Sequence, residues 1–141
     1  MIYEGNFDES FEELCCICDP TFIRRSYEEA SLMGNETSKV FVNADEKKSA
    51  VYAIAVVDYD PVITTVPLPA DVARLDLICA NHQNKVSGAV KKLFSHVVSR
   101  LKKDGKRFLL LKVSPSNKRA VDFYKHLGFK RYKGYYIKEL R

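Results

Sequence analysis

The fold of this chain is decided by the stretch NKRAVDFYKHLGF at residues 117–129. Its apolar residues recur at helical spacing, and Gly128 is the residue type that ends a helix in the left-handed conformation and lets the chain turn back into a strand. We predict a helix from Ser116 to His126, with Ser114-Pro115-Ser116 as its cap. The residues expected on its buried side are Ala120, Phe123 and Tyr124.

The segments on either side of this helix have strand patterns. RFLLLKV at residues 107–113 is a nearly continuous apolar run, which is typical of a strand covered on both faces. After the helix, residues 129–132 and 135–139 form two short strands around a Lys133-Gly134 turn. The end of the chain is therefore predicted to be a strand, a helix and a hairpin.

Another strand and helix precede this unit. VARLDLICA at residues 72–80 predicts a strand, and a helix is expected to start near Gly88 and to end at Gly105. The apolar stripe of that helix consists of Val90, Leu93, Phe94, Val97, Val98 and Leu101. Its outward face carries Lys91, Lys92, Arg100 and Lys102.

The amino-terminal half adds elements of both kinds. They are a strand at 2–5, helices at about 8–20 and 21–33, and a hairpin of strands at 39–43 and 50–59. Residues 60–71 hold three prolines and are expected to be a loop. The order βααβββαβαββ predicts a mixed α/β sheet, in one domain that spans residues 1–141.

Composition excludes several classes of protein. Of 141 residues 46% are hydrophobic, which suffices for a core, and no apolar run approaches the roughly 20 residues of a membrane-spanning helix. The first residues lack the pattern of a secretory signal, so a cytoplasmic location is expected. The cysteines at 15, 16, 18 and 79 lack a zinc spacing, and we expect reduced thiols rather than a metal site.

The charge of the chain is divided unevenly. Residues 1–71 carry 5 Lys or Arg against 14 Asp or Glu, whereas residues 72–141 carry 18 against 4. The basic half favours an anionic ligand, and a polyphosphate, a nucleic acid or an anionic surface would each suit it. Charge alone does not choose among them.

Residues 117–129 resemble the N-x-x-A-x-x-F-Y-x-x-x-G-F pattern of the GNAT N-acetyltransferase superfamily at every specified position. The predicted order of elements agrees with that GNAT-like fold over nearly the whole chain. The resemblance implies acetyl-CoA as cosubstrate, no metal and direct transfer to an amine. It also implies that Asn117 contacts the pantetheine region and that Tyr124 protonates the departing thiolate. From the residues alone, Asn117 is a helix cap and Tyr124 belongs to the core.

A second site is expected where residues 77–93 pass from strand to helix, because N–H groups at a helix amino terminus attract a diphosphate. The family pattern here is R/Q-x-x-G-x-G/A, which fits with Lys85, Gly88 and Val90, or in another register from Gln83 to Gly88. Val90 either obstructs the cofactor or points into the core. The expected cofactor-binding residues are Ile78, Cys79, Ala80, Lys85, Val86, Ser87, Gly88, Ala89, Val90, Lys91, Asn117, Arg119, Ala120, Phe123 and Tyr124.

Asp76 is a charged residue inside an apolar strand. Strict alternation would put Leu75, Leu77 and Cys79 on one face and Arg74, Asp76 and Ile78 on the other. One interpretation is a surface ion pair with Arg74. In the other, Asp76 is catalytic and handles the proton of the acceptor amine, as the resemblance implies.

The predicted function is transfer of an acetyl group from acetyl-CoA to a primary amine, of a small molecule or a lysine side chain. The acceptor is expected among the first two helices, the 60–71 loop and the last hairpin, where Glu28, Glu29, Asp58 and Asp60 favour a cation. A GNAT-fold protein that binds acyl-CoA without turnover is the first alternative. A nucleic-acid-binding domain is the second, and the core spacing of the aromatic residues disfavours it. The protein is expected to be a monomer or a homodimer.

Overall fold

The computed structural model describes residues 1–5, 37–61, 71–81 and 86–141. These residues form one seven-stranded sheet in the order β1-β2-β3-β4-β5-β7-β6. The strands are β1 Ile2–Gly5, β2 Ser38–Ala44, β3 Val51–Asp58, β4 Val72–Ala80, β5 Phe108–Leu111, β6 Lys130–Tyr132 and β7 Tyr135–Glu139. The helices are α3 Ala89–Lys103 and α4 Lys118–His126. The predicted mixed α/β sheet is confirmed, while the two helices predicted within residues 8–33 lie outside the described residues.

The sheet is antiparallel except at its centre, where β4 and β5 run parallel. The predicted β2–β3 hairpin is confirmed, and Asp45 fixes its turn by accepting hydrogen bonds from the N–H groups of Ser49 and Ala50. The predicted turn at Lys133-Gly134 is confirmed as well, with both residues at positive φ. Turn chemistry written in the sequence thus sets both hairpins.

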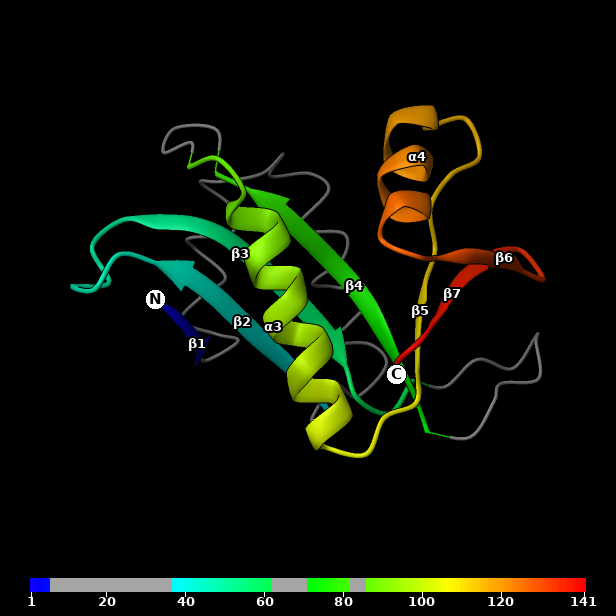
Figure 1. Ribbon diagram of the computed structural model, residues 1–141, viewed down its shortest axis with the longest axis horizontal. Coiled ribbons are helices and arrows are strands. Elements are labelled where there is room, and N and C mark those ends of the chain that lie inside the picture. Colours follow the sequence, from blue (N-terminus) through cyan, green and yellow to red (C-terminus); the bar gives the residue numbers. More distant parts are fainter. Residues whose placement is uncertain (6–36, 62–70, 82–85) are drawn as a thin grey trace.

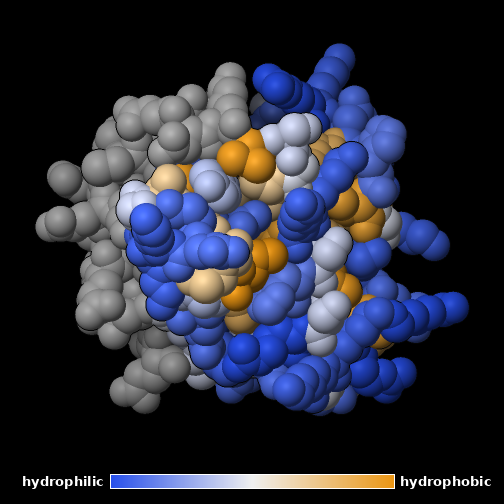
Figure 2. Space-filling model, turned by 60° about the vertical axis from the view of Figure 1, so that its left-hand side comes forward, coloured by the Kyte–Doolittle hydropathy of each residue, from blue (hydrophilic) through white to orange (hydrophobic). Residues whose placement is uncertain are grey.

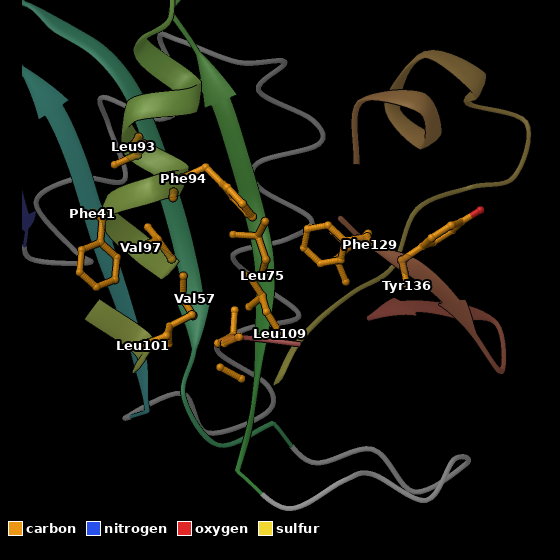
Figure 3. Packing of buried hydrophobic residues seen from close by; sticks show 14 of the residues in the cluster. Phe41, Val57, Leu75, Leu93, Phe94, Val97, Leu101, Leu109, Phe129 and Tyr136 are labelled. Atoms are coloured by element: carbon orange, nitrogen blue, oxygen red, sulfur yellow. The ribbon is translucent and has the colours of Figure 1, made fainter. Parts of the chain in front are cut away.

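The helix α3 lies diagonally across one face of β2, β3 and β4, as Figure 1 shows. Its apolar stripe buries Leu93, Val97 and Leu101 against Phe41 and Val57 of the strands (Figure 3). Each such side chain contributes roughly 1.5–3 kcal/mol on burial. A second cluster lies on the strands, and its buried members among the described residues are Val40, Val42, Ala44, Val51, Ile54, Val56 and Leu77.

The carboxyl-terminal unit is shorter than predicted at its edges. β5 keeps only Phe108–Leu111 of the expected 107–113, and its three leucines are buried as expected of a covered strand. The expected Ser114 to Ser116 cap is wrong: the Ser114 carbonyl instead accepts the N–H of Asn117 and closes a turn. The helix α4 therefore begins at Lys118, after Asn117.

The described surface is mostly hydrophilic. On the face in Figure 2 the hydrophobic areas are small and separated by hydrophilic residues, and Met1 and Val86 are the only large hydrophobic residues among the described ones that are exposed. No helix in the described ranges has the length and apolar character to cross a membrane. Every described phenylalanine or tyrosine is at least half-buried, which weighs against stacking on nucleic-acid bases.

Candidate active site

A β-bulge in β4 makes Asp76 an extra residue between two paired positions of the strand. Val56 of β3 pairs with Leu77, and the next residue, Val57, pairs with Leu75, so Asp76 is an extra residue with no partner position on β3. The bulge moves Leu77 to the other face of the sheet from Leu75. The prediction that Leu75, Leu77 and Cys79 share one face is therefore wrong, because strict alternation fails across a bulge.

The parallel pairing of β4 with β5 stops immediately before this bulge. It joins Val72, Ala73 and Arg74 to residues 108–110, while β4 itself continues to Ala80. Figure 1 shows the two strands diverging toward the end at which α3 begins and α4 lies. Among the described strands, only β3 pairs with β4 from the bulge onward, so the other edge of β4 presents backbone N–H and C=O groups that β5 does not take up.

The predicted strand residues of the site lie on this diverging part of β4. Ile78 is half-buried and packs against the core cluster under α3, while Ala80 is opposite Ala53 of β3. Cys79 packs on the second cluster and is disulfide-bonded. The expected reduced thiol is wrong at Cys79, because a disulfide depends on spatial proximity that sequence spacing does not reveal.

The amino terminus of α3 has the features of an anion site. Gly88 caps the helix in the left-handed conformation with a φ of 78°, and a side chain there would meet open space. The N–H groups of Val90 and Lys91 find no acceptor among the described residues. The first turn contains no acidic residue, and Lys91 and Lys92 are exposed.

The other residues of this loop that were predicted to bind the cofactor differ in how exposed they are. Val86 and Ser87 are exposed beside Gly88, whereas Ala89 is buried under the helix. Lys85 lies outside the described residues. Val90 is half-buried and packs against the core cluster, which removes the steric objection that its branched side chain raised. The open space at Gly88, the two N–H groups and the lysines fit the diphosphate of acetyl-CoA.

On α4, Asn117 is the helix cap. Its side-chain oxygen accepts a hydrogen bond from the N–H of Ala120 at 3.2 Å, and the residue is exposed. This bond uses the carbonyl oxygen of the amide and not its NH₂ group. The capping role read from the sequence is confirmed, and the pantetheine contact stays a prediction.

A Schellman motif at the end of α4 holds Tyr124 in place. With Gly128 at a φ of 95°, the Phe129 N–H returns to the Tyr124 carbonyl at 3.1 Å and the Gly128 N–H to the Lys125 carbonyl at 3.0 Å. The Tyr124 and Phe129 rings then pack edge to face with centroids 5.7 Å apart. The spacing from tyrosine to glycine to phenylalanine in residues 124–129 is therefore what this helix end requires.

The Tyr124 hydroxyl has no hydrogen-bond partner in the described part of the chain, although the ring packs against the main core. Burial raises the pKa of this phenol above its usual value near 10, because a phenolate is poorly solvated there. The hydroxyl is thus protonated at neutral pH and is able to donate. The backbone partner that a purely structural tyrosine would need is not present among the described residues.

Ala120 and Phe123 are less buried than the sequence pattern predicts. Val121, rather than Ala120 or Phe123, is the buried residue of α4, because the helix presents Val121 and Tyr124 to the core. Phe123 is half-buried and meets the Tyr124 ring edge to face at 5.4 Å. Ala120 is half-buried and Arg119 is exposed in the first turn.

Asp76 forms an ion pair with Arg74 through the guanidinium Nε. The side chains are only 15% and 16% exposed, so the expected surface pair is in fact largely buried. Arg74 also lies 3.5 Å from Asp58, whose carboxylate accepts a hydrogen bond from Thr37. Asp58 was expected to make an acceptor site acidic, but it is 3% exposed and bonds inside the protein instead.

Two buried asparagines were missed by the sequence reasoning. Asn43 is 7% exposed and bonds to Ala89, and Asn81 is 8% exposed and bonds to Val51. The only signal in the sequence was an amide at the end of each apolar strand, which is equally typical of a turn. No group of three or more side chains suited to hold a metal occurs in the described ranges.

The match to a family model identifies the class of protein. The model of the Acetyltransferase (GNAT) family matches residues 7–129, and the chain therefore belongs to this family. Members of the family are acetyl-CoA-dependent acetyltransferases. No curated protein matches the chain.

Solved structures agree with this family fold. An N-acetyltransferase from Staphylococcus aureus Mu50 is 15% identical with a TM-score of 0.69, and the match covers 100% of this chain and 98% of that one. The Escherichia coli ribosomal-protein-S18-alanine N-acetyltransferase is 17% identical with a TM-score of 0.61, over 99% and 94%. The E. coli N-acetyltransferase YhbS in complex with CoA is 13% identical with a TM-score of 0.70, over 100% and 81%. At these identities the likeness establishes the fold.

Proposed function

We propose that this protein moves the acetyl group of acetyl-CoA directly to a primary amine, on a cationic small molecule or a lysine side chain. One observation carries the proposal. Where β4 leaves β5 at the Asp76 bulge, an open strand edge, the amino terminus of α3 and the helix α4, which carries the protonated Tyr124, belong to the same end of the sheet (Figure 1). Acetyl-CoA would use the strand edge for its pantetheine, the α3 terminus for its diphosphate and the hydroxyl for its departing thiolate.

The binding half of the proposal rests on α3 and on the strand edge. The N–H groups of Val90 and Lys91, with the charges of Lys91 and Lys92, suit the diphosphate. The backbone of β4 at residues 78–80 is suited to pair with the amide groups of pantetheine, as a further strand would. The CoA complex of the E. coli neighbour supports this placement by analogy of fold.

In the reaction, the amine nitrogen attacks the thioester carbonyl carbon. The ammonium loses one proton before the attack, and the C–N bond then forms. As the C–S bond breaks, the nitrogen loses a second proton and the thiolate takes one up. We assign the proton that reaches the thiolate to the Tyr124 hydroxyl, which regains a proton through solvent from the one that the nitrogen releases. Because a thiolate with a parent pKa of about 8.5 leaves tolerably well, general acid catalysis should contribute roughly 10²- to 10⁴-fold.

Deprotonating the amine is the more costly step. A lysine-like amine with a pKa of about 10.4 is protonated at pH 7, and making it neutral costs roughly 4.6 kcal/mol. We assign the uptake of this proton, directly or through water, to Asp76, which Arg74 holds at the bulge. Positioning of the amine against the thioester supplies most of the remaining rate.

The decisive experiment measures release of free thiol from acetyl-CoA with a panel of amines that includes polyamines and lysine peptides. Tyr124→Phe should lower kcat by about a hundredfold and leave the KM for acetyl-CoA nearly unchanged, because only the proton donor is lost. Tyr3→Phe on the distant strand β1 is the matched control and should keep the wild-type rate. Thermal stabilisation by acetyl-CoA without thiol release from any amine would instead establish a protein that binds without turnover.

The role of Asp76 is tested separately by the pH dependence of turnover. Asp76→Asn should depress kcat/KM most at low pH, where little free amine is present, and the deficit should shrink as solvent takes over deprotonation at high pH. Thr37→Val breaks a hydrogen bond to Asp58 in the same network without changing Asp76. A deficit that is the same at every pH in both variants would make Asp76 a structural ion pair only.

A further inference from the structure

Two buried asparagines hold the two ends of the segment that joins β4 to α3. Asn81 directly follows β4, and Asn43, on β2, reaches the first residue of α3. The segment between these attachments leads into the anion site at Gly88. Both side chains bond to backbone carbonyls of neighbouring elements, and neither belongs to the site residues described above.

Asn81 is anchored through a second bulge in the sheet. Asn43 of β2 pairs with Ala53, but the next residue, Ala44, pairs with Val51, so Tyr52 is an extra residue on β3. The Asn81 N–H donates to the Tyr52 carbonyl at 2.9 Å, and its side-chain NH₂ donates to the Val51 carbonyl at 2.8 Å. Asn81 thus bonds to two successive carbonyls and fixes the end of β4.

Asn43 anchors the other end. Its side-chain NH₂ donates to the Ala89 carbonyl at 3.2 Å, across from β2 to the first turn of α3. The N–H groups of Val90 and Lys91, which the diphosphate would use, come directly after this attachment. A small rotation of the first turn would change the direction of both N–H groups. The hydrogen bond from Asn43 therefore helps to fix that direction.

We infer that Asn43 is a positioning residue that orients the α3 amino terminus for the diphosphate of acetyl-CoA. The inference rests on the proposed function and adds to it a residue that sets cofactor recognition. Asn43 acts through the Ala89 carbonyl of α3, so its effect is on the diphosphate and not on the thioester. Asn81 instead fixes the end of β4, whose edge is proposed to pair with pantetheine, and serves as the contrast.

The amide group is specifically suited to this task. Leucine has a similar size and would fill the same space, but it cannot donate, and the Val51 or Ala89 carbonyl would lose this partner inside the protein. Serine keeps a donor on a shorter side chain. The pair of substitutions Asn→Leu and Asn→Ser at each position therefore separates packing from hydrogen bonding.

The test compares two acetyl donors that share the thioester and differ in the diphosphate. For Asn43→Leu, kcat/KM with acetyl-CoA should fall about tenfold, through KM, while kcat/KM with acetyl-pantetheine stays within about twofold of wild type. Asn81→Leu should lower kcat/KM for the two donors alike, because both contain the pantetheine that β4 is proposed to bind. Acetyl-pantetheine has no diphosphate and cannot sense the direction of the α3 N–H groups. If a leucine variant does not fold, the serine variant at that position is measured with the same two donors.

Tyr59→Phe is the matched control, because it removes a hydrogen bond to Asp104 at the opposite end of α3. This variant should lose stability but keep the wild-type ratio of kcat/KM for the two donors. A ratio of kcat/KM for the two donors that is unchanged in the Asn43 variants, through an equal loss or through no loss, would overturn the inference and leave Asn43 structural.

Failure of the proposed function is distinguishable from failure of this inference. If the wild-type protein transfers acetyl to no amine, calorimetry with CoA and with pantetheine replaces the rates. Weakened binding of CoA with unchanged binding of pantetheine in the Asn43 variants would still support the positioning role. Equal binding of CoA by wild type and variants would overturn it.

Discussion

The two ends of α3 are built on opposite principles. At its carboxyl terminus, Arg100, Lys102 and Lys103 lie in the last turn, where the helix dipole favours cations. The Lys106 N–H returns to the Leu101 carbonyl at 2.9 Å and the Gly105 N–H to the Lys102 carbonyl at 3.1 Å, which completes a Schellman motif. The helix end is therefore satisfied by its own chain.

Further contacts fasten that same end to the sheet. Asp104 accepts hydrogen bonds from the Tyr59 hydroxyl at 2.8 Å and from Arg100 at 3.1 Å. Arg100 also lies 3.6 Å from Glu4, and Lys39 lies over the Tyr59 ring. Exposed ion pairs contribute little singly, but this group links the end of α3 to β1 through Glu4 and to Tyr59, the residue that follows β3.

The described residues give the amino terminus of α3 far fewer contacts of this kind. It has no side-chain cap and no acid, and the two lysines in its first turn oppose the helix dipole at a cost of roughly 0.3–1 kcal/mol each. Only Asn43 ties the first turn to the sheet through a described side-chain hydrogen bond. The difference indicates that the carboxyl terminus of α3 contributes to stability, whereas the amino terminus is suited to bind an anion. A bound anion would neutralise the unfavourable positive charge at the amino terminus.

The largest expected effect comes from reversing the charges at the amino terminus. Lys91→Glu with Lys92→Glu should weaken acetyl-CoA binding by about a hundredfold and raise the stability of the free protein by roughly 0.5–2 kcal/mol. Calorimetric titration and thermal melts without ligand measure the two changes. The loss of affinity should also become smaller as salt is added.

The same change of net charge at the other end of α3 is the control. Lys102→Glu with Lys103→Glu should lower stability and leave acetyl-CoA affinity within about twofold at 0.15 M salt, where the screening length is about 8 Å. Similar losses of affinity for the two double variants would show that only net charge matters. The proposal that only the amino terminus of α3 binds acetyl-CoA would then be wrong.

A smaller effect is expected from matched glycine substitutions. Gly88 and Gly105 have φ values of 78° and 86°, and a side chain at either would meet no atom within 4 Å. Gly88→Ala and Gly105→Ala should each cost about 1 kcal/mol of stability through backbone strain alone. Only Gly88→Ala should also weaken acetyl-CoA, by about tenfold, because its methyl group enters the anion site; equal affinities would contradict that location.

The smallest effect concerns Tyr59, whose removal as Tyr59→Phe should cost about 1 kcal/mol or less at neutral pH and no affinity for acetyl-CoA. The hydrogen bond from Tyr59 lowers the pKa of Asp104, and burial, followed by that same bond, raises the pKa of Tyr59. A lowered carboxyl pKa stabilises above the unfolded value of about 3.9, and a raised phenol pKa stabilises below about 10.

Urea unfolding across pH measures this signature. The difference in unfolding free energy between wild type and Tyr59→Phe should be constant from about pH 5 to 9. It should shrink as pH falls below about 4, because Asp104 becomes protonated, and again as pH rises above about 10. A difference that persists unchanged at pH 3 would show that Asp104 does not need its charge to hold Tyr59.

Much of the fold was readable because its signals are local. The β4 bounds, the start of α3 at Gly88 and the turn at Lys133-Gly134 follow from apolar period and glycine chemistry over a few residues. The start of α4 was placed two residues early, because Ser116 and Asn117 are both good caps and only the Ala120 bond selects Asn117.

The sequence predicted only part of the candidate site. Tyr124, Gly128 and Phe129 form a local motif, so their arrangement was predictable. The Asp76 bulge was not, since an extra residue is defined by the pairing of two strands and not by one of them. The disulfide at Cys79 and the roles of Asn43 and Asn81 also depend on partners far away in sequence.

The sequence by itself determined the family, the elements of the carboxyl-terminal half and the basic character of that half, because each of these is encoded in short patterns or in composition. Only the tertiary structure decided where β4 parts from β5, which face each β4 residue takes and which end of α3 is left unsatisfied. These depend on strand register and on hydrogen bonds between distant segments, and register is fixed by packing of the whole sheet.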